Sequence, residues 1–186
     1  MVSDIAKSTA RKRSGSMAEI NPDWSIGAKE PTKRQIAKWE AIKYVVSPLG
    51  NGLYLSGFPD DSVQNRMKEL DIGFMFSCTR AVPPGIPGVA IIRTPFDDNV
   101  NELPDLQQLQ WSAETIADLV EDGEIVLIHC MYGLNRSALL AAHAMALLDP
   151  EMRGKDILTA IRSARPGALH NALFADAVTK LNKTSP

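Results

Sequence analysis

The sequence has few cysteines and no long apolar run. Only two cysteines occur in 186 residues, so we expect no disulfide framework and infer a reducing compartment. No stretch approaches the roughly 18 consecutive apolar residues of a membrane-spanning helix, and the first residues lack the apolar core of a secretory signal. We therefore expect a cytoplasmic protein that makes no use of a membrane.

The chain also lacks a strong charge of either sign, with a formal net charge of −2. Residues 1–16 hold four basic side chains against one acidic, which leaves the remainder net acidic. Polynucleotide binding usually rests on many phosphate-neutralising Lys and Arg residues, so this body is not an obvious polynucleotide binder. We expect residues 1–30 to form a basic, disordered tail. A nucleic-acid or targeting role for it stays open, but a solvated flexible end is favoured. Residues 31–186 should form one catalytic domain with a single core.

Residues 129–137 read His-Cys-Met-Tyr-Gly-Leu-Asn-Arg-Ser and follow the apolar run 125–128. A strand that feeds a short loop and then a helix brings several backbone N–H groups to one point, where they form an anion-binding nest. We expect Cys130 to lie at the base of this nest as a thiolate stabilised by the amides and the helix dipole. The planar fork of Arg136 can bind two phosphate oxygens at once.

The other loop positions support the same interpretation. Gly133 lets the backbone come close without a side chain, and the Ser137 hydroxyl is expected within reach of the sulfur. The alternative is a buried strand whose cysteine happens to precede a polar turn. Gly, Arg and Ser at these three offsets occur by chance roughly a few times in ten thousand per cysteine, and the strand-then-helix context disfavours chance further. The predicted phosphate-binding N–H groups belong to Met131, Tyr132, Gly133, Leu134 and Asn135.

The signature His129-Cys130-x5-Arg136-Ser137 resembles that of the cysteine-dependent dual-specificity phosphatases of the protein tyrosine phosphatase superfamily. The resemblance covers roughly residues 44–182. It implies a phosphomonoester hydrolase that acts through a cysteinyl-phosphate intermediate. Neither a metal nor another cofactor is expected, because the arginine and the amides already neutralise the phosphate. The sequence does not indicate which oligomeric state the protein adopts.

The resemblance also implies roles for residues around the loop. In the family, the histidine that precedes the nucleophile orders the loop by hydrogen bonding, which gives His129 its expected role. Arg165-Pro166 and Asn171 resemble the close of these domains, where they support the active-site face. These residues are expected to be structural rather than catalytic.

A leaving alkoxide or phenoxide needs a proton, so a carboxylic acid must reach it from another loop. The segment Pro-Phe-Asp-Asp-Asn at 95–99 follows a predicted strand and resembles the general-acid loop of the family, whose pattern is proline, apolar, any residue, aspartate. Alignment on the proline assigns Asp98 as the acid and leaves Asp97 as a solvated or capping neighbour. Loop geometry decides which carboxylate points inward, and a solvated turn with no catalytic role is the remaining alternative.

The substrate is less well determined. The Gly-Leu-Asn-Arg-Ser segment at 133–137 resembles the loop of RNA 5′-phosphatases and triphosphatases, but it also occurs in protein phosphatases. Tensin-homologue lipid phosphatases carry lysines in this loop, whereas its variable positions here are neutral. We expect a phosphorylated protein substrate and dual (Tyr/Ser/Thr) specificity. An RNA 5′ end is the alternative substrate, and a phosphate-binding pseudophosphatase is the alternative function.

Cys78 is a possible redox partner of Cys130. It ends the apolar run 72–77, which in a parallel sheet would finish at the same edge as the strand carrying Cys130. The resemblance to the tensin-homologue phosphatases, where a cysteine at a similar place bonds to the nucleophile, suggests the same disulfide. The favoured alternative is a small buried hydrophobe.

The spacing of apolar residues predicts an α/β fold. Strands are expected at 53–56, 72–78, 89–94 and 124–129, and helices at 33–43, 61–70, 103–121, 136–148, 154–165 and 171–181. Because strands alternate with helices, we expect a single domain with a mostly parallel sheet of about four to five strands, covered by helices on both faces. The apolar helix 136–148 should be the central buried one.

Overall fold

One mixed sheet organises the computed structural model, which describes residues 31–183. Its strand order is β1-β2-β5-β3-β4, with β5 in the centre and parallel to both β2 and β3. β4 is parallel to β3, and only β1 runs antiparallel, as an edge strand beside β2. The strands are β1 Ser47–Gly50, β2 Leu53–Ser56, β3 Phe74–Ser77, β4 Ala90–Arg93 and β5 Val126–His129.

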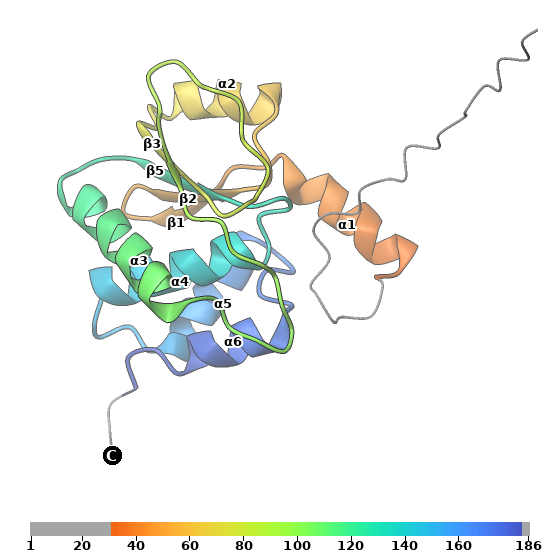
Figure 1. Ribbon diagram of the computed structural model, residues 1–186, viewed down its shortest axis with the longest axis vertical. Coiled ribbons are helices and arrows are strands. Elements are labelled where there is room, and N and C mark those ends of the chain that lie inside the picture. The colour runs from red at the N-terminus through yellow and green to blue at the C-terminus, as the bar shows by residue number, and fades with distance from the viewer. Residues whose placement is uncertain (1–30, 184–186) are drawn as a thin grey trace, which may run out of the picture.

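The described residues form six helices, of which α2 to α6 cover the two faces of this sheet and α1 lies at its side (Figure 1). α2 lies on one face, where Val63 and Met67 pack with Met75 and Leu127. α3, α4, α5 and α6 lie on the other face and enclose the larger core. The helices are α1 Lys33–Lys43, α2 Asp61–Glu69, α3 Leu106–Glu121, α4 Arg136–Leu148, α5 Gly154–Ala164 and α6 Ala172–Thr179. The predicted fold class is confirmed, whereas the predicted tail at 1–30 lies outside the described residues.

Most predicted bounds differ from the observed ones by one or two residues at an end, and two differences have a clear physical reason. β1 was missed because Pro48 and Gly50 weaken a strand pattern, and proline is tolerated at a sheet edge. α3 begins at Leu106 rather than Leu103, since the Asp105 carboxylate accepts hydrogen bonds from the backbone N–H groups that open the helix. Neither difference changes the position of the loop after β5.

The register of the central strands places the functional residues at one edge. Ser56 of β2 and Ser77 of β3 both pair with His129, the last residue of β5. The loop 130–135 therefore leaves the sheet at its carboxyl edge, flanked by the ends of two parallel neighbours. It then enters α4, which is buried along most of its length as predicted.

Candidate active site

The loop after β5 surrounds the Cys130 sulfur with hydrogen-bond donors. Cys130 is 3% exposed. Its Sγ accepts a hydrogen bond from the Gly133 N–H at 3.2 Å and another from the Ser137 hydroxyl at 3.3 Å. The structure thus places the two predicted residues, 133 and 137, at the sulfur.

The carbonyl groups of the loop bond outward. Met131 O accepts from the Phe58 N–H, Tyr132 O from the Arg165 guanidinium, and Leu134 O from the Leu169 N–H, at 2.7 to 3.0 Å. Because the N–H of a peptide unit points opposite to its C=O, the N–H groups that follow these carbonyls face the inside of the loop. This is the arrangement of an anion-binding nest.

Gly133 is required by the shape of the loop. Its φ of +70° lies in the left-handed region, where a side chain is strained. A Cβ built at this position would lie 2.4 Å from the Ser56 carbonyl oxygen and 2.6 Å from Arg165 Nη2. The loop can therefore approach β2 this closely only with glycine at residue 133.

Arg136 is the first residue of α4 and is 4% exposed. Asn135, which precedes it, is the N-cap residue of α4 and makes no side-chain capping bond to the helix. The hydrogen bond from Arg80 is the main cause that lowers the pKa of Asp97, and burial is the main cause of the changed pKa values of Cys78 and His129. In all three groups the positive charge of Arg136 is a smaller influence, and it acts to lower the pKa. The cation thus lies close to both the loop and the acid segment.

His129 lies beneath the loop and is fully buried. Its Nδ1 is 3.4 Å from the Cys130 carbonyl oxygen, and its ring meets the edge of Phe58 at 5.7 Å between centroids. Burial lowers the pKa of His129 to about 4, so its ring is neutral at pH 7. A neutral, enclosed imidazole suits the expected role in ordering the loop.

The two neighbouring aspartates have different partners. Asp97 accepts two hydrogen bonds of 2.9 Å from the exposed guanidinium of Arg80, which lowers the pKa of Asp97. Asp98 is only 8% exposed and turns to the loop. Its Oδ2 accepts from Asn135 Nδ2 and its Oδ1 from Asn171 Nδ2, both at 2.7 Å. Of the two carboxylates, Asp98 is the one held beside the loop that follows Cys130.

The structure brings several residues to this site that the sequence did not mark. His170 Nε2 lies 2.9 Å from Asn135 Nδ2, and the His170 ring stacks on Trp39 of α1 with centroids 4.7 Å apart. Asn135 was expected to contribute its backbone N–H, and its side chain in addition donates to Asp98. The sequence offered one signal for His170, which is its position directly before Asn171. It offered none for Trp39, which reaches the site through tertiary packing alone.

Cys78 continues the pairing of β3 with β5 past its last register pair. Its N–H donates to His129 O at 2.9 Å, which sets it beside Cys130. Cys78 is fully buried, and burial together with the nearby Cys130 raises the pKa of its thiol well above the usual value. Both cysteines are free thiols in the structure.

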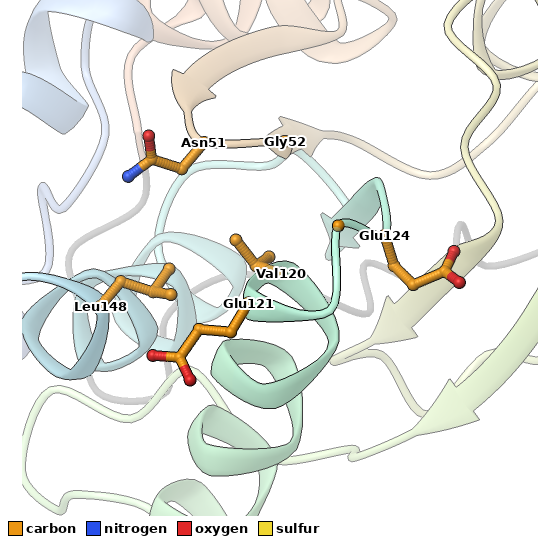
Figure 2. Close-up of a pocket in the computed structure, with 7 residues that line it drawn as sticks. Asn51, Gly52, Val120, Glu121, Glu124 and Leu148 are labelled. Atoms are coloured by element: carbon orange, nitrogen blue, oxygen red, sulfur yellow. The ribbon is translucent and has the colours of Figure 1, made fainter.

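A cavity of about 500 Å³ lies at the opposite edge of the sheet from this site, before β2 and β5 (Figure 2). Its carboxylates, Glu121 and Glu124, point in different directions, so they do not converge on a common point. Across residues 31–183, no three His, Cys, Asp or Glu side chains gather in a way that could hold a metal ion. In the same part of the chain, every helix is too short or too polar to cross a bilayer.

Comparison with known proteins agrees with this geometry. The sequence model of the family described as "Dual specificity phosphatase, catalytic domain" matches residues 53–184. Dual specificity protein phosphatase 22 of Xenopus laevis is 29% identical over 127 residues, which make up 66% of this chain and 58% of that protein. Protein tyrosine phosphatase type IVA 3 of Mus musculus is 32% identical over 85 residues, or 45% of this chain and 47% of that protein. The chain therefore spans about half the length of these relatives.

Solved structures show the same fold. The crystal structure of DUSP15 superposes on this chain with a TM-score of 0.66 at 22% identity. The superposed region makes up 74% of this chain and 86% of the DUSP15 chain. The crystal structure of human DUSP28 superposes with a TM-score of 0.64 at 22% identity, and covers 74% of this chain and 92% of that one.

Proposed function

The chain belongs to the dual specificity phosphatase family, and on that premise we propose that it hydrolyses phosphate monoesters of proteins through a cysteinyl-phosphate intermediate. The observation that carries this proposal is the Cys130 sulfur, which accepts hydrogen bonds from Gly133 N–H and Ser137 Oγ at the base of a loop whose carbonyls bond outward. The catalytic unit is residues 31–186.

In the first step, the Cys130 thiolate attacks phosphorus in line with the ester oxygen. An S–P bond forms and the P–O ester bond breaks. Arg136 and the inward N–H groups stabilise the charge on the three equatorial oxygens. Asp98 gives its proton to the departing oxygen, so the product leaves as a neutral alcohol or phenol.

In the second step, water attacks the phosphocysteine. Asp98, now a carboxylate, accepts a proton from the water as its oxygen bonds to phosphorus. The S–P bond breaks and inorganic phosphate leaves. Ser137 donates its hydrogen bond to the sulfur at 3.3 Å, which stabilises the thiolate as it departs. The nucleophile must remain reduced between turnovers, and a reducing compartment such as the cytoplasm suits this requirement.

A protein substrate is favoured over an RNA 5′ end. The RNA alternative came from the segment 133–137, and its Asn135 donates to Asp98 at 2.7 Å, so this residue has a role within the protein that needs no RNA. The loop contributes no lysine, which disfavours a highly phosphorylated lipid. Cys130, Arg136 and Asp98 are all present, which disfavours a pseudophosphatase.

Replacement of the nucleophile tests the proposal. We expect Cys130→Ser to abolish hydrolysis of p-nitrophenyl phosphate while it retains vanadate binding, because the loop amides and Arg136 remain. Chelators should leave the wild-type rate unchanged. A panel of phosphopeptides, 5′-triphosphorylated RNA and phosphoinositides, assayed side by side, then ranks the substrate classes. Near-wild-type turnover by Cys130→Ser, or a strict need for a divalent ion, would overturn the mechanism.

The adjacent aspartates provide a matched pair of variants. Asp98→Asn should lower kcat for phenyl phosphate by about a hundred- to ten-thousand-fold, as loss of a general acid does, and less for p-nitrophenyl phosphate, whose leaving group needs little protonation. Asp97→Asn removes only an exposed ion pair with Arg80, whose side chains are 45% and 74% exposed. It should change neither rate by more than about twofold, since such pairs contribute little. A larger, leaving-group-dependent loss in Asp97→Asn would assign the acid to that residue instead.

A further inference from the structure

A chain of side-chain contacts runs from the N-terminal helix α1 to the carboxylate of Asp98. Trp39 stacks on His170, His170 contacts Asn135, and Asn135 donates to Asp98. We propose that His170 and Trp39 are positioning residues for proton transfer, and that they act through the amide of Asn135. This inference rests on the proposed function, in which Asp98 is the general acid.

The hydrogen bonds around Asn135 fix the orientation of its amide. Asn135 Oδ1 accepts from the backbone N–H of Asn171 at 3.1 Å, and Nδ2 donates to Asp98 Oδ2 at 2.7 Å. A flipped amide would place an oxygen against the carboxylate and an NH₂ group against an N–H, so the observed orientation is required. The second hydrogen of Nδ2 then points to His170 Nε2, 2.9 Å away.

The same bonds determine the tautomer of His170. Since Asn135 Nδ2 is a donor, His170 Nε2 must offer a lone pair, and the ring proton must lie on Nδ1. Nδ1 lies 3.3 Å from the Gly167 carbonyl oxygen, which accepts that proton. Desolvation of the ring, the largest effect, lowers the pKa of His170 below the usual 6.5, so the neutral form is present at pH 7. His170 Nε2 thus accepts a hydrogen bond from the same Asn135 amide that donates to Asp98, and so helps to hold that amide in place.

Trp39 holds the His170 ring from the other side. The two rings are nearly parallel, with 17° between their planes and centroids 4.7 Å apart. Trp39 lies on α1, a helix without a fully buried residue. The carboxyl end of α1 is joined to the body by the Arg165 guanidinium, which donates to Ile42 O at 2.8 Å. The aromatic contact therefore connects a peripheral helix to the acid loop.

This arrangement predicts a defect in one step of the reaction. Without the His170 acceptor, one N–H of Asn135 loses its partner, and its amide can rotate away from Asp98. Phosphate binding by Arg136 and the loop N–H groups is unaffected. The loss should therefore fall on kcat for poor leaving groups, with KM nearly unchanged.

Two replacements of His170 separate its acceptor from its packing. His170→Phe keeps a ring to stack on Trp39 but has no acceptor. His170→Gln can place Oε1 near the position of Nε2 and so keeps the acceptor. We expect His170→Phe to lower kcat for phenyl phosphate about five- to tenfold, the equivalent of one net hydrogen bond, and to leave p-nitrophenyl phosphate within about twofold. His170→Gln should restore most of the loss.

A third variant tests the role of the helix. Trp39→Leu keeps an apolar side chain on α1 but removes the stacked ring, and it should produce the same leaving-group-dependent loss to a smaller extent. Because Trp39 lies on a peripheral helix, this variant keeps the test available if His170→Phe does not fold. Urea unfolding of each variant confirms that the comparison is made between folded proteins.

The outcomes separate this inference from the proposed function. Equal losses in His170→Phe and His170→Gln, or equal losses on both substrates, would overturn the positioning role. Wild-type values in His170→Phe and Trp39→Leu would do the same. If Asp98→Asn, measured in the same series, shows no leaving-group dependence, then the assignment of the acid fails and the inference fails with it.

Discussion

The buried guanidinium of Arg165 is the side chain whose loss should most affect both stability and the site. It is 1% exposed, and burial lowers its pKa only to about 10, so it stays charged at pH 7. It joins the end of α1, the start of β1 and the phosphate-binding loop. Its acceptors, at 2.7 to 3.4 Å, are the carbonyl oxygens of Ile42, Lys43, Val45 and Tyr132 and the hydroxyl of Ser47.

Arg165→Met keeps most of the volume and removes every one of these donors. Each buried carbonyl left without a partner costs about 1–3 kcal/mol, but neighbouring losses do not add in full. Disruption of a buried charged network typically costs about 3–5 kcal/mol. We therefore expect a loss of about 4 kcal/mol from the free energy of unfolding, out of the roughly 5–15 kcal/mol of a typical domain.

The measurement is urea unfolding at pH 7 and 25 °C, followed by circular dichroism. Arg66→Met is the matched control, because it removes an exposed arginine whose ion pair with Glu69 should contribute no more than about 1 kcal/mol. Arg165→Met should also bind vanadate more weakly, since the carbonyl of Tyr132 in the loop loses its donor. If the two variants lose equal stability, the role assigned to Arg165 is wrong.

Two further predictions concern His129, which precedes Cys130 in the chain, and Cys78, which lies beside Cys130 at the end of the neighbouring strand. His129 has a pKa of about 4 in the folded protein against about 6.5 when unfolded, so the unfolded chain binds the extra proton as pH falls from 6.5 to 4. Between pH 6.5 and pH 4, the free energy of unfolding of the wild type should fall by about 3 kcal/mol more than that of His129→Gln. If urea unfolding shows the same pH dependence for the two proteins, this prediction is wrong. Cys78 is predicted to trap the sulfenic acid that peroxide forms on Cys130, with release of water, because neighbouring parallel strands lie about 4.8 Å apart, within the reach of a disulfide. Mass spectrometry after mild peroxide should find a Cys78–Cys130 peptide and dithiothreitol should restore activity, whereas sulfinic or sulfonic Cys130 beside a free Cys78 would rule out protection.

Sequence alone determined the features that depend on near neighbours. Apolar periodicity gave the helices and four of the five described strands to within a few residues. The spacing from Cys130 to Arg136 predicted the loop and the family. These features are local, because backbone geometry and periodic burial act over a few residues. β1 escaped because its pairing with β2, rather than its own residues, makes it a strand.

Only the tertiary structure decided how Asp98, the proposed general acid, is held. The sequence favoured Asp98 over Asp97 by alignment alone. In the fold, Arg80 pairs with Asp97, while Asn135 and Asn171, which lie 37 and 73 residues from Asp98 in the chain, donate to Asp98. Contacts over such separations depend on which loops come together at the carboxyl edge of the sheet. A local sequence pattern does not predict which loops these are.

The same reason explains the residues that were missed. Trp39 and His170 lie near opposite ends of the described residues 31–183, and neither belongs to a recognisable motif in its own segment. Their rings stack only because the fold places α1 beside the edge of the sheet where β5 ends. The sequence thus specified the proposed nucleophile and its loop through local geometry, whereas the surroundings of the proposed acid, Asp98, depend on side chains that only the folded chain brings together.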